Sequence, residues 1–195
     1  MSHASITALP DDVAPPIRLT NLIWVAIALL VMIVAIEAGS LWFLNFVHVM
    51  AGVLWTGIDL FMGFVIGPIL RRSPYPARRA IICRLMPRTL FLMPTLSIIT
   101  GTAGWFLAER IGYLNIAYPQ FWWVIAALVI ITILTVQGLG ILLPTNLRVY
   151  FELRKPNPDI SKVGRMMRLY IYSVAFQGSM QVAIIVVMAR FATGL

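Results

Sequence analysis

A histidine and an aspartate are the two residues whose types and positions point to chemistry. His48 is the only histidine beyond the N-terminal segment, and Asp59 is the only acid deep inside an apolar stretch, which runs from Leu41 to Arg72. In a helix, eleven residues at about 100° each make nearly three turns, so the two side chains share a face, roughly 16 Å apart along the axis. Lipid offers such residues no partner, so we expect this face to contact protein, a cofactor or water.

The imidazole of His48 is the candidate metal or cofactor ligand. Neutral imidazole binds haem iron and copper ions well, and a helix can direct it into a bundle. Gly52 lies one turn further on and would leave space for a cofactor, and Trp55 could pack against a porphyrin edge. The structural alternatives are a hydrogen bond from His48 to a neighbouring helix and ordinary packing of Trp55. No residue stands out as catalytic.

The carboxyl group of Asp59 needs a partner. A charged side chain at the centre of a bilayer costs about 2.5–3.5 kcal/mol even on the insertion-derived scale. Gln177 and Gln181 lie four residues apart, so they form one polar stripe that must also face inward. The other candidate partners are Gln137 and the Ser or Thr hydroxyl groups of the last three spans. The cluster could be structural, or Asp59 could handle protons, and the residues alone favour neither.

The composition is that of an integral membrane protein. Hydrophobic residues make up 61% of the 195 residues and charged residues 11%, and the mean hydropathy is +0.91. Soluble domains carry roughly 25% charged residues. The net charge of +8 does not indicate nucleic acid, because the basic residues flank apolar runs, as membrane topology requires. The single cysteine, Cys83, excludes a disulfide or a cysteine-based metal cage within one chain.

The apolar runs predict an all-α bundle of five transmembrane helices. They cover residues 20–37, 41–70, 90–108, 121–143 and 169–192. We expect the first two to form an antiparallel hairpin, and the prolines at the ends of the second and fourth to bend those helices. Residues 1–18 are polar and proline-containing, which predicts a flexible tail before a single transmembrane domain at 19–195.

Two basic segments predict the orientation. Residues 71–89 and 146–168 hold six Lys or Arg each, out of fifteen in the chain, and both are expected as loops, the first with a short amphipathic helix on the lipid surface. By the positive-inside rule both are cytoplasmic. In a bacterial inner membrane the N-terminus would then be cytoplasmic and the C-terminus periplasmic. This places His48 in the outer half of the membrane and Asp59 near its middle.

The helix that carries His48 also carries a motif. The motif reads His48-x6-Trp55-x-Gly57 and ends in Gly67-Pro68 followed by arginine. It resembles the signature helix of a superfamily of small membrane proteins that includes the copper-resistance D (CopD) type and the HemJ-type protoporphyrinogen IX oxidases. The resemblance covers about residues 41–193 and makes the first span an addition to a four-helix unit. It implies b-type haem on the histidine of this helix.

The chain also departs from both named types. HemJ-type proteins have a lysine just after the tryptophan of a later helix, and residues 121–129 contain none. CopD-type proteins commonly carry further histidines or methionine clusters for copper, whereas here only His48 is in a span. A haem would therefore be five-coordinate, use a methionine as its second ligand, or take a ligand from a second protomer or subunit.

Three functions follow as hypotheses. The leading one is a haem b-binding membrane protein or subunit in electron transfer or quinone-linked redox chemistry, with His48 as axial ligand. The second is a copper-handling protein, and the third is a cofactor-free structural subunit of a larger complex. The sequence does not determine whether the protein is an enzyme or whether it forms a homodimer.

Overall fold

The computed structural model describes residues 19–155 and 157–194, and none of these residues forms a strand. The helices are α1 (Asn21–Glu37), α2 (Leu41–Phe61), α3 (Gly67–Arg72), α4 (Tyr75–Ile111), α5 (Phe121–Gln137), α6 (Leu143–Leu153) and α7 (Ile160–Ala192). The π-helical segments η1 (Met62–Ile66) and η3 (Gly138–Leu142) join α2 to α3 and α5 to α6, and the 3-10 turn η2 (Tyr113–Asn115) follows α4. The predicted tail at 1–18, with His3, lies outside the described residues.

Four helical stretches are long and apolar enough to cross a membrane. They are Leu41–Arg72, Pro76–Ile111, Phe121–Leu153 and Ile160–Ala192. The predicted first span corresponds to α1, a shorter apolar helix of 17 residues. Large apolar side chains cover the outer surface of the bundle, such as Phe64, which is 78% exposed. In the described part of the chain, the predicted all-α architecture with helices able to cross a membrane is confirmed, whereas the predicted count of five spans is not.

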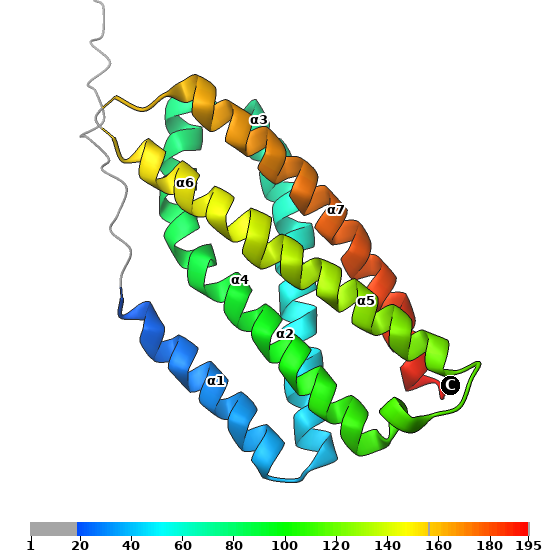
Figure 1. Cartoon of the computed structure of the whole chain (residues 1–195). Coiled ribbons are helices and arrows are strands. Elements are labelled where there is room, and N and C mark those ends of the chain that lie inside the picture. The colour runs from blue at the N-terminus through cyan, green and yellow to red at the C-terminus, as the bar shows by residue number, and fades with distance from the viewer. Residues whose placement is uncertain (1–18, 156, 195) are drawn as a thin grey trace, which may run out of the picture.

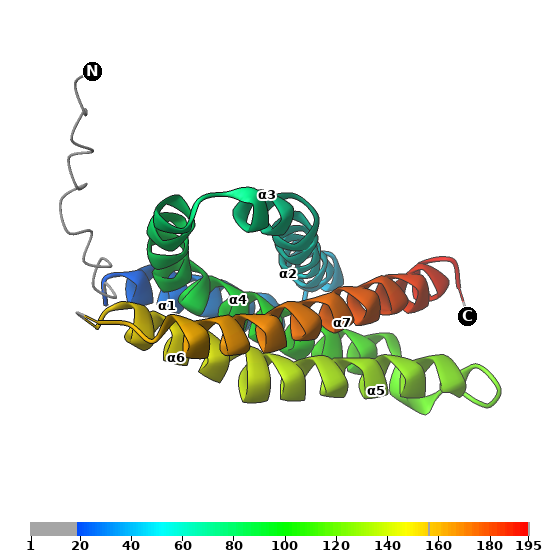
Figure 2. The same ribbon diagram turned by 90° about the horizontal axis from the view of Figure 1, so that it is seen from above.

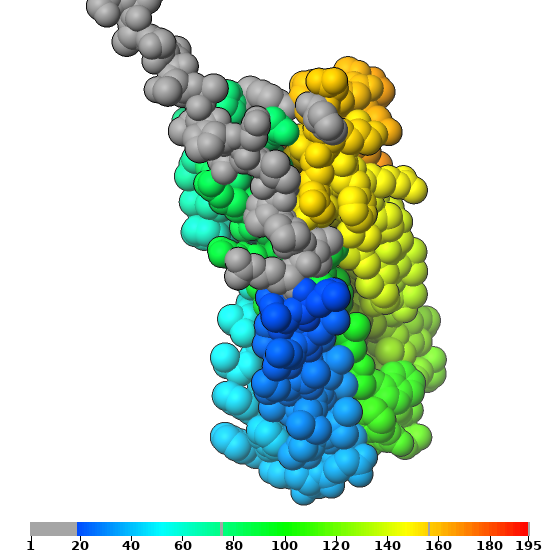
Figure 3. All heavy atoms as spheres, turned by 90° about the vertical axis from the view of Figure 1, so that its left-hand side faces the viewer, coloured from blue at the N-terminus to red at the C-terminus, as the bar shows by residue number. Residues whose placement is uncertain are grey.

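The helices form an elongated bundle whose turns gather at its two ends (Figure 1). The turn between α1 and α2, the loop after α4 and the C-terminus lie at one end, and the α3–α4 and α6–α7 connections lie at the other (Figures 1 and 2). α4 packs along α2, and α5 along α7. The shorter helix α1 lies on the outside, against α2 and α4 (Figure 3). The two basic segments therefore lie at the same end, which we call the basic end.

The first basic segment is not a surface loop. The predicted loop at 71–89 and the predicted span at 90–108 are largely one continuous helix, α4, which passes through Pro87 and Pro94. Each proline removes one backbone donor from the helix. Nearby hydroxyls bond to carbonyls of the same stretch: Thr89 Oγ1 donates to Met86 O at 3.2 Å, and Ser97 Oγ donates to Pro94 O at 2.9 Å. The helix is continuous through both prolines.

The second basic segment is also mostly helical. α6 continues to Leu153 and α7 begins at Ile160, so the predicted loop at 146–168 shrinks to residues 154–159. Asp159 caps α7 by accepting from Lys162 N at 2.9 Å, a hydrogen bond that holds the pKa of this carboxyl below its ordinary value. Arg79 Nη2 of α4 donates to Leu153 O at the end of α6. The helices continue because they pack on each other, around a buried cluster of Cys83, Met86, Val149, Tyr150, Leu153 and Val163.

Two π-helical turns interrupt the long spans. In η1 the cap N–H of Gly67 bonds to Met62 O, and in η3 the cap N–H of Leu143 bonds to Gly138 O. Each π turn lies just before a proline, Pro68 or Pro144. The chain remains helical beyond both prolines, in α3 and α6, where we expected a bend or an end. Single π turns of this kind occur frequently at functional sites.

Candidate functional site

His48 lies between α2 and α4. Its Nδ1 is 2.9 Å from the backbone oxygen of Thr100, and the side chain is half-buried. A carbonyl oxygen can only accept a hydrogen bond, so this contact assigns the hydrogen to Nδ1. In the neutral ring, Nε2 then carries the lone pair and is the nitrogen that can bind a metal or accept a proton.

A glycine of α4 makes room for this ring. A Cβ atom at Gly104 would lie 2.7 Å from His48 Cε1 and 2.9 Å from Nδ1, which is too close for any side chain. At Gly52, in contrast, a Cβ would meet the Thr100 side chain at 3.4 Å, an ordinary contact distance. The sequence alone did not identify Gly104 or Thr100, because their role depends on the register between two helices.

The fit between Gly104 and His48 predicts the effect of one added methyl group. Gly104→Ala should displace the imidazole and break its hydrogen bond to Thr100, lowering the free energy of unfolding by about 1–3 kcal/mol, the range typical of overpacking. Gly101→Ala is the matched control, because its Cβ would meet Ile131 Cγ1 at an ordinary 3.9 Å. Thermal unfolding of both variants in detergent measures the difference, and equal stabilities would contradict the predicted clash.

Trp55 lies in the main core of the bundle. It is 5% exposed and belongs to a buried cluster that joins four helices. The cluster contains Met32, Ala35, Leu44, Val47, Ala51, Trp55, Leu96, Ile99, Ala103 and Leu134. In these surroundings Trp55 acts as a packing residue. It helps to hold α2, and therefore His48 and Asp59, in place.

Asp59 is held by two glutamines of α7. Its side chain is 8% exposed, and both Gln177 Nε2 and Gln181 Nε2 donate to its Oδ2, the latter at 2.8 Å. Both glutamines are among the partners that the sequence predicted for Asp59, because they too are polar residues within an apolar run. The expectation that Asp59 faces the interior and bonds to another span is confirmed.

The polar cluster extends beyond Asp59 along α7. Gln137 of α5 donates through Nε2 to the backbone oxygen of Ser173. Tyr170 lies one turn before Ser173 on α7 and adds a hydroxyl group to the same face of the helix. The α7 members follow a spacing of three or four residues, which places them on one face of the helix. They are Tyr170, Ser173, Gln177 and Gln181, and we call them the α7 polar stripe.

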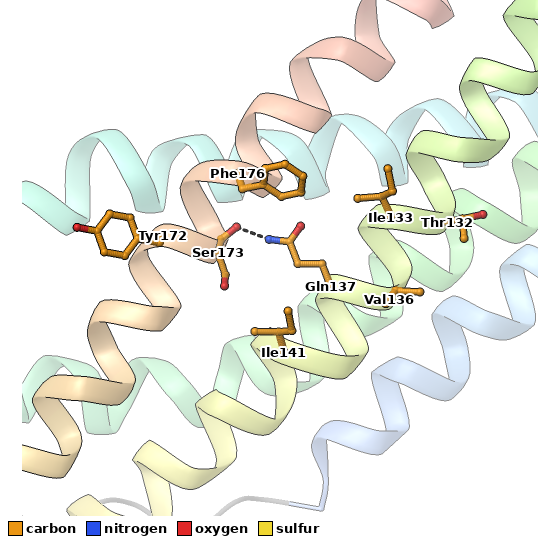
Figure 4. Close-up of a pocket in the computed structure, with 8 residues that line it drawn as sticks. All are labelled: Thr132, Ile133, Val136, Gln137, Ile141, Tyr172, Ser173 and Phe176. Atoms are coloured by element: carbon orange, nitrogen blue, oxygen red, sulfur yellow. Dashed lines mark hydrogen bonds between the residues drawn. The ribbon is translucent and has the colours of Figure 1, made fainter.

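A groove opens beside this stripe on the membrane-facing side of α5 and α7. It has a volume of about 480 Å³, and Figure 4 shows the Gln137 side chain reaching across it toward Ser173. The remaining wall is largely apolar and consists of Thr132, Ile133, Val136, Ile141, Tyr172 and Phe176. Gln137 forms part of the wall of this groove, with its side chain only 6% exposed.

α2 thus carries two separate features: an imidazole bonded through Nδ1 to α4, and, eleven residues further along, a carboxyl group bonded to two amides of α7. Within the described part of the chain, no group of three or more His, Cys, Asp or Glu lies close enough together to hold a metal ion. His48 is therefore a single protein ligand at most among these residue types. No family model, curated protein or solved structure matches this chain.

Proposed function

We propose that the protein is a haem b-binding membrane protein, or a subunit of one, that works in electron transfer with His48 as an axial ligand. The observation that supports it most is the hydrogen bond from His48 Nδ1 to the Thr100 carbonyl. Such a bond on the outer nitrogen orients a ligating imidazole and makes it a stronger donor. The resemblance of the His48–Trp55–Gly57 motif to the CopD and HemJ types supports the same ligand.

The chain's own residues have distinct parts in this proposal. His48 donates the Nε2 lone pair, Thr100 fixes the ring, and Gly104 allows the ring to lie against α4. A b-type haem, when bound, supplies one-electron redox chemistry whose potential depends on the axial ligands. The second ligand would come from a methionine, a second protomer or a partner subunit, and a membrane quinone is the proposed redox partner.

The proposed topology has five spans, with α1 as the fifth. At 1.5 Å per residue α1 is about 26 Å long, close to the roughly 30 Å of the hydrocarbon core. Arg110 of α4 donates to Ile36 O and so caps the last turn of α1. We place the basic end in the cytoplasm and the C-terminus in the periplasm of a bacterial inner membrane, because moving twelve cationic side chains across a bilayer is costly.

Cysteine labelling tests this orientation. Ser161 and Gln120 are both exposed but lie at opposite ends of the bundle, and the native Cys83 is buried and should give little background. An impermeant maleimide applied to intact cells should label Gln120→Cys and leave Ser161→Cys unlabelled until the membrane is opened. Labelling of Ser161→Cys in intact cells would reverse the proposed topology.

A visible spectrum of the purified protein, before and after dithionite, tests the haem directly. We expect a Soret band that shifts on reduction, and iron at a fixed ratio to protein. A colourless protein without iron would reject the proposal. Copper at a fixed ratio in place of iron would assign the site to copper handling instead.

A cofactor-free structural subunit is the second candidate, and one observation favours it. The His48–Thr100 bond also fastens α2 to α4 without any ligand, which is the structural reading of a histidine in a bundle. This function predicts a protein that is colourless and metal-free, and unstable when expressed alone. Co-purification with other membrane subunits would identify the complex.

A further inference from the structure

We propose that Asp59 is a reversible proton-binding site, connected to the basic end of the bundle by the α7 polar stripe. The inference does not depend on haem, because Asp59 lies three helical turns away from His48. It rests on the partners of the carboxyl group, on unpaired amide oxygens next to it, and on where the stripe ends.

The two glutamines can accommodate both protonation states of Asp59. An amide carries two donors on Nε2 and an acceptor on Oε1. As the structure stands, Gln177 and Gln181 direct Nε2 to Asp59 Oδ2, which stabilises the carboxylate. Rotating one amide by half a turn presents Oε1 to the O–H of the carboxylic acid. The proton can therefore enter or leave without leaving the buried carboxyl group unpaired.

The amide oxygens of the cluster support a proton rather than a purely structural role. Oε1 of Gln137, Gln177 and Gln181 has no hydrogen-bond partner among the described residues, and these side chains are only 6%, 3% and 1% exposed. Inside a membrane such acceptors need donors. A protonated Asp59 or internal water can supply such a donor.

The stripe leads toward the basic end. Tyr170 lies seven residues from Gln177, about 10 Å along α7, on the same face of the helix. Two residues further toward the basic end comes the exposed Arg168. The hydroxyl group of Tyr170 can both donate and accept a hydrogen bond, so it can join the cluster to the surface.

The π-helical turns lie beside the cluster. η1 begins three residues after Asp59, and η3 begins directly after Gln137. A π turn widens the helix and alters the local backbone bonding. Both elements that face the α7 glutamines therefore carry a π turn close to their polar side chain.

Infrared difference spectroscopy of the purified protein in lipid vesicles tests whether Asp59 binds a proton. A change of pH should produce a band in the carboxylic-acid C=O stretching region that is absent in Asp59→Asn and retained in His48→Ala. No Asp59-dependent band at any pH at which the protein stays folded would overturn the proposal. A band that titrates with sodium at constant pH would also overturn it, in favour of a cation site.

The route is tested by the rate at which this band responds to a pH jump. Tyr170→Phe removes one hydroxyl and should slow the response about tenfold, equivalent to ~1.4 kcal/mol of barrier. Tyr172→Phe is the matched control, because Tyr172 lies two residues away on the same helix and is 74% exposed. Circular dichroism checks that both variants are folded. Equal rates in the two variants would reject the path through Tyr170.

Discussion

His48→Ala should yield an assembled protein that has lost its Soret absorption. The side chain removed is the proposed axial ligand, whereas the helix contact that it leaves behind is modest. Thr100 O loses one hydrogen bond, which contributes about 0.5–1.5 kcal/mol in a typical case. Loss of the pigment from a protein that is still folded would therefore show that His48 binds the haem and is not needed for the fold. The measurements are the visible spectrum, iron content and thermal unfolding of the purified variant.

Two further variants sharpen this result. His48→Gln preserves hydrogen bonding to Thr100 but provides a poor haem ligand, so it should lose the pigment as His48→Ala does. Asn45→Ala is the control, because Asn45 is an exposed polar residue one turn away on the same helix and should leave the spectrum unchanged. If His48→Gln keeps both spectrum and stability, His48 is a structural residue and the haem assignment is wrong.

The inward face of α2 could be predicted from the sequence because its chemistry is local. A carboxylate in an apolar run must have a partner, and few polar residues in the other runs could supply one. This reasoning placed Gln177 and Gln181 among several candidate partners of Asp59, and the structure shows that these two bond to it. The same reasoning could not choose between a cofactor and a neighbouring helix for His48, because an imidazole is satisfied by either.

Contacts that depend on helix register could not be predicted. Gly104 matters because it lies opposite His48 in the bundle, and the residues around it in the sequence do not indicate that the two are in contact. Gly52 was assigned to a cofactor on spacing alone, and the structure places it beside the Thr100 side chain of α4. Small residues in membrane helices indicate close packing, but the partner that approaches them is a property of the assembled bundle.

The basic segments were misjudged for a different reason. Their arginines and prolines are typical of surface loops, and hydropathy marks only the part of a helix that lies in lipid. α4 and α7 extend beyond that part because their ends pack against α6 outside the apolar region. Glu152 of α6 adds to this packing through ion pairs with Lys155 and Lys162 at 2.8 and 3.2 Å. Tertiary contacts of this kind override local sequence signals.

The largest loss of stability is expected when Asp59 is deprived of both its donors. In the double variant Gln177→Leu/Gln181→Leu the buried carboxyl group would have no α7 amide to accept from. Leaving a buried charge without its partners typically costs about 3–5 kcal/mol. The double variant should therefore unfold at a clearly lower temperature or denaturant concentration than the parent protein, as measured by circular dichroism in detergent.

Removing the carboxyl group as well should restore much of that loss. The triple variant Asp59→Leu/Gln177→Leu/Gln181→Leu replaces the whole polar group by apolar side chains, an exchange that is often neutral or stabilising in buried sites. Recovery of stability in the triple variant would show that the double variant is destabilised by the unpaired carboxyl group of Asp59, and not by a poor fit of leucine on α7. If the triple variant is as unstable as the double, packing at Gln177 and Gln181 is the cause, and their hydrogen bonds to Asp59 contribute little to stability.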